Sequence, residues 1–200
     1  MKKILSSILG IVLILVLSVN VMAVDKLLTV PFADITGGTG YIYGEMVGNS
    51  YRQFEGAYNV NSRVSAGGII SFIDNEETDL GFLLKGVLLE ETEDRPMVSV
   101  GLRMKDLYLV SSKNIGMGIR GHVGIGDGDI DGLFIGFNKV INPLTISQGD
   151  SATLPVMNLM GEYVNEQINL GLRMTLQDNM KVDLGLLDFD QFKLGIGYDF

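Results

Sequence analysis

The chain of 200 residues has no cysteine, one histidine, no tryptophan and four prolines. Without cysteine, an exported protein cannot be a small scaffold held together by disulfides. A single histidine and no thiol leave little material for a zinc or iron site, so the composition predicts no cofactor. Beyond residue 23, the sequence contains no apolar run of the ~20 residues that a membrane helix needs, and no segment has convincing helical periodicity.

Positive charge is also scarce. Fifteen basic residues face 24 acidic ones, for a net charge of −9. This acidic balance argues against nucleic acid as a partner. Glycine, in contrast, is abundant at 26 residues, and the mean hydropathy is positive at +0.29. A hydrophobic, glycine-rich chain without a membrane helix is most simply all-β, and glycines inside strands suggest sites of close packing.

The first 23 residues have the layout of a secretory signal peptide. Lys2 and Lys3 precede an apolar stretch over 4–17, and the small residue Ala23 follows at a suitable cleavage position. The alternative is an uncleaved N-terminal anchor. Either way, the sequence predicts export, and residues 24–200 form a single predicted domain with a net charge of −11.

The last ten residues show the clearest pattern of the mature chain. Phe192, Leu194, Ile196, Tyr198 and Phe200 occupy every second position, with glycine or charged residues between them. Successive side chains of a strand point to opposite faces, so one face here is apolar and the other is small or charged. The pattern resembles the C-terminal signal that the barrel-assembly machinery of the outer membrane reads.

Similar period-two patterning recurs along the whole mature chain. It predicts strands at 39–48, 51–60, 63–73, 79–90, 97–102, 106–112, 115–124, 131–140, 154–164, 166–177, 179–187 and 191–200. Twelve strands is the preferred count. The uncertain point is 97–112, where residues 104–106 are either a tight turn or part of one long strand, but both termini at the periplasmic end require an even number, so ten is the alternative. Turn residues separate the segments, Asn114 among them.

Alternation alone fits two architectures. In a soluble sandwich or barrel the apolar face points inward, whereas in a membrane barrel it points to lipid. The strand lengths suit a bilayer. Aromatic residues at strand ends suit interface girdles at its borders: Tyr41, Tyr43, Tyr51, Tyr163, Tyr198 and Phe200. We therefore predict a transmembrane antiparallel β-barrel, with outer-membrane lipid and the assembly machinery as partners. A secreted soluble β-barrel or sandwich that binds apolar ligands is the alternative.

The charged side chains would then face the lumen. The candidates for lumen-lining residues are Lys85, Arg120, His122, Glu162, Arg173, Lys181, Asp183 and Lys193. Buried charges need partners or water, so mixed signs on neighbouring strands predict either a polar plug or a narrow wet passage for small solutes or glycans. Tight turns at 61–62, 165 and 178–179 and longer loops at 74–79, 90–96, 125–131 and 141–153 suggest a periplasmic and an exterior end, with both termini periplasmic.

Two local motifs contain residue types that bind metals or act in catalysis. Asp127, Asp129 and Asp131 resemble the front half of a calcium loop, but Asn138 stands where the loop requires glutamate. An acidic hairpin tip is the preferred interpretation. His122, with Ser99, Ser111 and Ser112, supplies residue types used in hydrolysis without the spacing of a known catalytic set, so the sequence predicts no enzyme.

Three segments carry a family resemblance. Residues 27–35, residues 58–68 and residues 107–113 resemble recurring stretches of YjbH-like outer-membrane proteins. The resemblance implies an outer-membrane barrel associated with exopolysaccharide export or the cell envelope. It carries no catalytic residue over to this chain.

Overall fold

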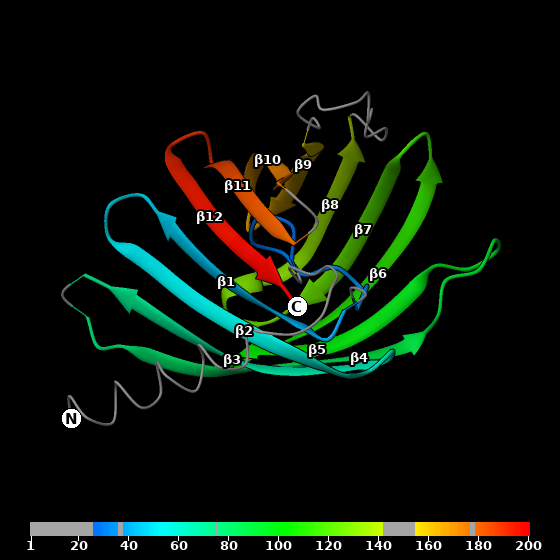
Figure 1. Cartoon of the computed structure of the whole chain (residues 1–200), viewed down its shortest axis with the longest axis horizontal. Helices are drawn as coiled ribbons and strands as arrows, with labels where there is room; N and C mark the ends of the chain where they lie inside the picture. Colours follow the sequence, from blue (N-terminus) through cyan, green and yellow to red (C-terminus); the bar gives the residue numbers. More distant parts are fainter. Residues whose placement is uncertain (1–25, 36–37, 75, 142–154, 177–178) are drawn as a thin grey trace, which may run out of the picture.

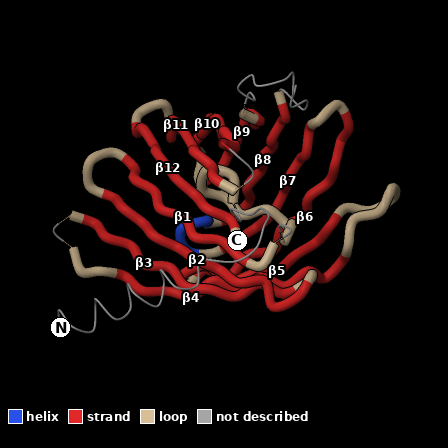
Figure 2. Tube along the Cα trace, viewed as in Figure 1, coloured by secondary structure: helices blue, strands red, loops and turns tan. Residues whose placement is uncertain are grey.

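The computed structural model describes residues 26–35, 38–74, 76–141, 155–176 and 179–200. Most of them are in strands. The strands are β1 (Gly40–Val47), β2 (Tyr51–Asn61), β3 (Val64–Ile73), β4 (Asp79–Leu89), β5 (Met97–Met104), β6 (Asp106–Gly116), β7 (Ile119–Gly126), β8 (Gly132–Val140), β9 (Val156–Val164), β10 (Gln167–Leu176), β11 (Met180–Leu187) and β12 (Gln191–Asp199). One turn of 3₁₀ helix, η1 (Gly128–Ile130), lies between β7 and β8 (Figure 2).

The strands form a closed antiparallel barrel (Figure 1). Each strand pairs with its neighbours in sequence, and β1 pairs with β12, for example through Tyr41 opposite Asp199. The predicted all-β fold with twelve strands is therefore confirmed. Met104 has a positive φ of 56° and starts the tight turn that separates β5 from β6, which excludes a single long strand at 97–112. Within the described residues, no helix has the length and hydrophobicity needed to cross a membrane.

The two faces of the wall differ in chemistry. On β10, Ile168 and Leu170 point outward and are 48% and 41% exposed, whereas Asn169 and Arg173 point inward and are buried. On β12, Phe192 and Ile196 are exposed, and Lys193 between them is fully buried. This is the reverse of a soluble barrel, in which water would meet the charged face. The outer surface is consequently an apolar belt over most of the strands.

The predicted aromatic girdle is wrong for three of its members. Tyr41 and Tyr43 on β1 are only 2% and 3% exposed, because both side chains point into the barrel. Tyr51 on β2 also points inward, where its hydroxyl contacts Gln53 and it lines a lumen cavity. The Tyr43 hydroxyl donates to Asp183 on β11, and the Tyr41 hydroxyl donates to Glu55 on β2. Glycine at 195 makes room for the Tyr43 ring, since a Cβ there would collide with it. Tyr163, by contrast, lies on the outer surface at 47% exposure.

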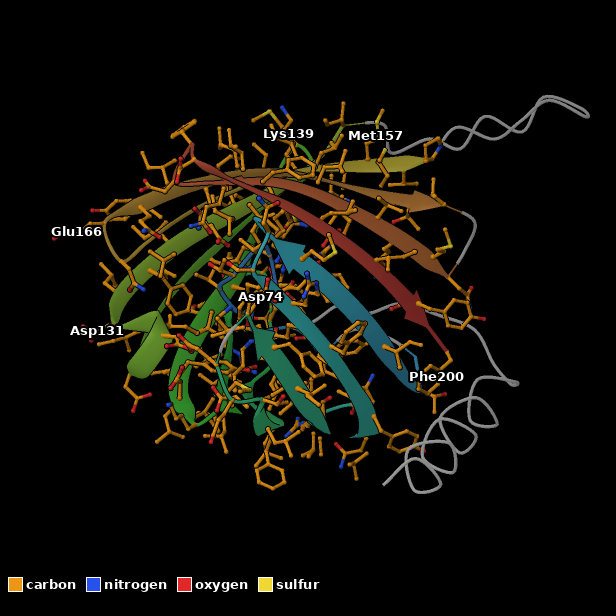
Figure 3. All side chains as sticks on the ribbon, turned by 90° about the vertical axis from the view of Figure 1, so that its left-hand side faces the viewer. Asp74, Asp131, Lys139, Met157, Glu166 and Phe200 are labelled. Carbon is orange, nitrogen blue, oxygen red and sulfur yellow. The ribbon has the colours of Figure 1, made fainter. Side chains whose placement is uncertain are left out.

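The connections also differ from the predicted rhythm of short and long. Because the strands alternate in direction, the end of the barrel that holds the start of β1 and the C-terminal Phe200 also holds the turns at 62–63 and 117–118 and the loop 90–96. The turns at 48–50 and 165–166 and the loops at 74–78 and 127–131 begin at the opposite end. Each end thus carries both short and longer links. Figure 3 shows Phe200 at one side of the molecule and Asp131 and Glu166 at the other. Loop length therefore does not sort the ends as predicted.

One predicted turn is displaced by a few residues. The break expected at Asn114 lies instead at Met117 and Gly118, which both have positive φ angles, of 52° and 73°. The strand β6 continues through Asn114 and pairs with Arg120 on β7. Asn114 was mistaken for a turn residue because asparagine favours turns, but its side chain bonds the amide of Gly116 at the end of the strand.

A feature that the strand pattern did not predict lies inside the barrel. Residues 26–35, called here the inner segment, run through the lumen before β1 begins (Figure 1). Leu27, Leu28, Val30, Phe32 and Ala33 are all at most 8% exposed. A turn closed by the Leu27 amide and the Val30 carbonyl, 3.0 Å apart, folds the segment back on itself.

Candidate functional site

The candidate functional site is the lumen, which the inner segment occupies. The side chains of the wall bind this segment largely at the segment's main-chain groups. Backbone carbonyls of the segment accept hydrogen bonds from Arg173, Lys193, Lys85 and Ser99, and backbone amides donate to Glu162 and Ser112. In a strand or a helix, these backbone groups would bond to other backbone groups. Here the wall side chains take the place of those backbone partners.

Glu162 on β9 is the centre of one group of contacts. Its carboxylate accepts from the amides of Leu28, Thr29 and Val30 at 2.9–3.2 Å, and also from the Thr29 hydroxyl. Asn169 on β10 donates a further bond of 2.9 Å. Three successive amides that converge on one carboxylate form an anion-binding nest. The negative charge of Glu162 is thereby balanced by dipoles of the inner segment.

On the strands that follow β9, cations bind the carbonyls of the segment. Arg173 makes two bonds of 2.7 Å to Asp183 and donates to the carbonyls of Lys26 and Leu27. Lys193 forms an ion pair with Glu45 at 2.7 Å and donates to the Leu28 carbonyl. These cations are therefore shared between wall carboxylates and the segment, which offsets the cost of burying them.

Lys26 joins the segment to an ionic cluster of β1, β2 and β5. Its ammonium group lies 2.9 Å from Glu45 and 3.6 Å from Glu55, and Arg103 forms an ion pair with Glu55 as well. Burial, together with the charge of Arg103, lowers the pKa of Lys26 to about 8, despite the two carboxylates that oppose this shift. The position of Lys26 is thus sensitive to mildly alkaline pH.

The far end of the segment is held in the same manner. Asp34 receives two bonds from Arg120 on β7, at 2.7 and 2.9 Å, and Arg120 also binds Glu91 in the acidic loop after β4. Lys85 on β4 donates to the carbonyls of Phe32 and Asp34 at 2.7 and 3.1 Å. Both ends of the inner segment are therefore fixed by charged groups.

His122 lies between two polar neighbours. Its Nδ1 is 2.8 Å from the Ser112 hydroxyl, and its Nε2 is 2.9 Å from the Asn138 side chain. Ser112, however, is only 1% exposed, and its hydroxyl accepts the Ala33 amide at 2.9 Å. A solute cannot reach a hydroxyl that the inner segment covers, so these contacts position the segment.

The apolar side chains of the segment pack against one sector of the wall. Tyr108 and Val110 on β6, Phe134 on β8, and Met160 and Val164 on β9 form this sector with Ile130. Glycines on β8 and β10 make room for two side chains of the segment. A Cβ at Gly136 would lie 2.5 Å from Leu27, and one at Gly171 would lie 2.5 Å from Leu28. The two leucines thus occupy hollows that only glycine provides.

The inner segment separates two cavities. One of about 370 Å³ opens at the end that holds the termini and is lined by Asp34, Arg120, His122 and Lys181, among others. The other, of about 540 Å³, opens at the opposite end and is lined by Lys26, Thr29, Gln53 and Arg103, among others. Both are lined largely by polar side chains, as a vestibule for hydrophilic solutes would be.

The sequence-derived candidates can now be placed. Lys85, His122, Glu162, Arg173, Lys181, Asp183 and Lys193 are buried, and Arg120 is half-buried. Five of these eight form hydrogen bonds with the inner segment, namely Lys85, Arg120, Glu162, Arg173 and Lys193. The ring of His122 lies beside that of Phe32, with the ring centroids 5.8 Å apart. Lys181 pairs with Asp199 at 2.9 Å, and Asp183 pairs with Arg173.

Sequence reasoning missed a second group, which lies on β1, β2 and β5 and in the inner segment: Lys26, Asp34, Glu45, Gln53, Glu55 and Arg103. The alternation could have identified Glu45 and Glu55, because each shares a strand face with an inward-facing neighbour. No pattern in residues 26–35 predicts their position inside the barrel. The candidates Asp127, Asp129 and Asp131 do not meet at a metal site, since the described residues contain no group of three or more His, Cys, Asp or Glu side chains able to hold an ion.

Comparison with known proteins gives a fold but no close relative. No protein-family model and no curated protein matches the chain. Among solved structures, the KdgM porin superposes with a TM-score of 0.56 at 12% identity, covering 80% of this chain and 98% of that chain. The KdgM porin in complex with disordered oligogalacturonate gives 0.53 at 13% identity, with the same coverage. Omp33 of Acinetobacter baumannii gives 0.49 at 11% identity. The chain therefore has the fold of a porin barrel.

Proposed function

We propose that this protein is an outer-membrane pore for small hydrophilic solutes, glycans included. One observation carries the proposal: the wall is apolar outside and charged inside. Leu80 and Phe82 on β4 are 77% and 72% exposed, whereas Lys85 on the same strand is 2% exposed. In water such an outer surface would associate, but in a bilayer it faces hydrocarbon.

The nature of the solute follows from the lining of the cavities. Amide, hydroxyl and charged side chains surround both vestibules, and these groups bind sugar hydroxyls and carboxylates by hydrogen bonds. The similar KdgM porin was solved with oligogalacturonate, which is a glycan. Glycan passage is consistent with this chain's lining and with the fold it shares with KdgM.

The remaining parts of the proposal concern export and assembly. Residues 1–23 act as a signal peptide, and the outward Phe192, Leu194 and Ile196 with the terminal Phe200 act as the signal for the assembly machinery. Phe200 also closes the wall, because its carbonyl accepts from the amides of Thr39 and Gly40. A role beside exopolysaccharide export, as in YjbH-like proteins, rests on the three resembling segments alone.

Two measurements test the proposal. First, cysteine probes at Leu172 and Arg173 report which face meets lipid, since the chain has no other cysteine. We expect a spin label at residue 172 to be relaxed by lipid-soluble oxygen and a label at 173 to be shielded from it. The opposite result, or release of the protein by carbonate without detergent, would favour the soluble binder of apolar ligands.

Second, purified protein in planar bilayers or in liposomes tests passage. We expect current or solute-driven swelling from the protein or from a variant whose lumen is opened. A lipid-embedded barrel that never conducts, even when opened, would exclude the pore and leave a structural role in the envelope.

A further inference from the structure

The inner segment lies across the path that a solute would take. Leu27 and Asp34 line the cavity at the end with the termini, while Lys26 and Thr29 line the cavity at the opposite end. The segment is thus the partition between the two vestibules. Its apolar side chains pack against β6, β8 and β9. Its main-chain groups bind polar side chains of β4, β5, β6, β9, β10 and β12.

The wall recognises this segment as a peptide. Carbonyls of residues 26, 27, 28, 32, 33 and 34 accept bonds from wall side chains, and amides of residues 28, 29, 30 and 33 donate to them. Main-chain recognition with pockets for selected side chains is how proteins bind extended peptides. The hollows at Gly136 and Gly171 are the pockets for Leu27 and Leu28.

The contacts between the wall and the inner segment are non-covalent and can therefore reverse. The chain has no cysteine, so no disulfide ties the segment to the wall. Each hydrogen bond and ion pair can be exchanged for one with water or with a polar solute, at modest net cost once water has entered. The wall groups left behind would line a continuous lumen.

We propose that the lumen wall is a peptide-binding site whose resident ligand is the protein's own inner segment, and that a solute path opens only when this segment leaves the site. The inference rests on the proposed pore function, since it names what controls the pore. It adds a binding site and a ligand, residues 26–35, that the pore function alone does not require.

Locking the segment in place gives the first test. Ala33→Cys combined with Ser112→Cys introduces the only two cysteines, at positions whose backbone amide and hydroxyl are 2.9 Å apart. With the bond formed, we expect conductance or swelling at least about tenfold below that of the same protein after reduction. The two single-cysteine variants, oxidised in parallel, are the controls and should not respond. Equal conductance of the bonded and reduced forms, with the bond verified by mass, would overturn the inference.

Loosening the segment gives the second test. Glu162→Gln keeps the shape of the side chain but removes the charge that three amides bind. In this background, we expect Ala33→Cys to react with a water-soluble thiol reagent at least about tenfold faster than in the parent, and the open-pore current to rise. Glu166→Gln, the same change at an exposed turn residue, is the matched control and should alter neither rate nor current.

The two readouts separate the failures. Faster labelling of residue 33 without any current in any variant would retain the peptide site and exclude the pore. Current that is unaffected by the lock, or labelling that is unaffected by Glu162→Gln, would retain the pore and exclude the displaceable segment.

A third test supplies the ligand from outside. In a chain whose residues 26–35 are replaced by a Gly-Ser stretch of equal length, a capped peptide of sequence 26–35 should bind and block the current, whereas a scrambled peptide should not. Block by both peptides, or by neither, would contradict specific recognition. If the replaced chain does not assemble, the cysteine lock in the full chain decides.

Discussion

Two sectors of the inner wall hold the inner segment by different physics. The sector of β6, β8 and β9 offers Tyr108, Val110, Phe134, Met160 and Val164, which pack against apolar side chains. The strands β1, β2 and β10–β12 offer mainly ion pairs and hydrogen bonds to main-chain atoms, and Glu162 on β9 adds three more such hydrogen bonds. Apolar packing stabilises contact without fixing direction, whereas charged groups impose one register. Together they bind one short peptide in one position.

The comparison predicts that the ionic sector is the more sensitive to loss of a single partner. Arg173→Leu would leave Asp183 buried without its guanidinium and two carbonyls of the segment without their donor. Breaking a buried pair in this way costs about 3–5 kcal/mol. We expect that loss in the free energy of unfolding in urea, measured on the barrel in detergent.

Two controls sharpen this prediction. Arg52→Leu removes a half-exposed pair with Asp74 and should cost less than about 1 kcal/mol. The double variant Arg173→Leu, Asp183→Leu should recover much of the loss, because no uncompensated charge is left. A loss for Arg173→Leu no larger than for Arg52→Leu would show that the ionic sector does not hold the structure.

The apolar packing of the inner segment should respond next. Leu28→Ala empties the hollow at Gly171 and Gly185, and a buried leucine cut to alanine costs about 2–5 kcal/mol. We expect the loss to appear chiefly as faster thiol labelling of Ala33→Cys, since the wall itself is unchanged. Leu170→Ala, on the outer face of β10, is the control and should leave labelling at the parental rate. Equal labelling in both variants would mean that the hollow does not retain the segment.

A smaller effect should follow pH. The pKa of Lys26 is lowered to about 8 where it lies beside Glu45, Glu55, Gln53, Arg103 and Lys193, and it returns to about 10.5 once the residue reaches water. Between pH 8 and pH 10.5, Lys26 is protonated in the displaced segment and neutral in the bound segment. Raising the pH therefore favours the bound segment, by at most about tenfold in the equilibrium constant per pH unit. Below pH 8 the dependence on this group vanishes. We expect the current to fall from pH 8 to pH 10, and Lys26→Met to remove that part of the slope. A slope that persists in Lys26→Met would assign it to other groups.

The smallest change should come from one neutral hydrogen bond. Ser112→Ala removes the acceptor for the Ala33 amide and one neighbour of His122. Such a bond contributes about 1 kcal/mol. Labelling of residue 33 should rise about fivefold, and Ser111→Ala, on the outer face of β6, should have no such effect. A similar rise in both variants would contradict the assignment of Ser112 to the segment.

The sequence predicted the wall well because alternation is a local property. On β10, Asn169, Gly171 and Arg173 alternate with Ile168 and Leu170, and that order alone states which side chains share a face. The strand count followed from the same rule. The interior was predicted less well, because which residues meet across a lumen depends on register and closure, which no single strand contains.

The inner segment shows the limit most clearly. Residues 26–35 have apolar residues and one proline but no strand partner in sequence. Their main-chain hydrogen bonds to the wall go to residues more than 50 positions away. The prediction that Tyr41 and Tyr43 lie in an outer girdle was wrong for a related reason. Glycine at 195 gives Tyr43 room inside the barrel, and this depends on the pairing of β1 with β12. Local periodicity does not predict how distant parts of a chain pack against each other.

The seam between β1 and β12 has a consequence for biogenesis. Thr39 and Gly40, just past the exit of the inner segment, bind the carbonyl of the final residue. The residues just before β1 and the residue just after β12 therefore meet at one line. Until β12 pairs with β1, the wall around residues 26–35 lacks a side, so capture of these residues accompanies the closure of the ring.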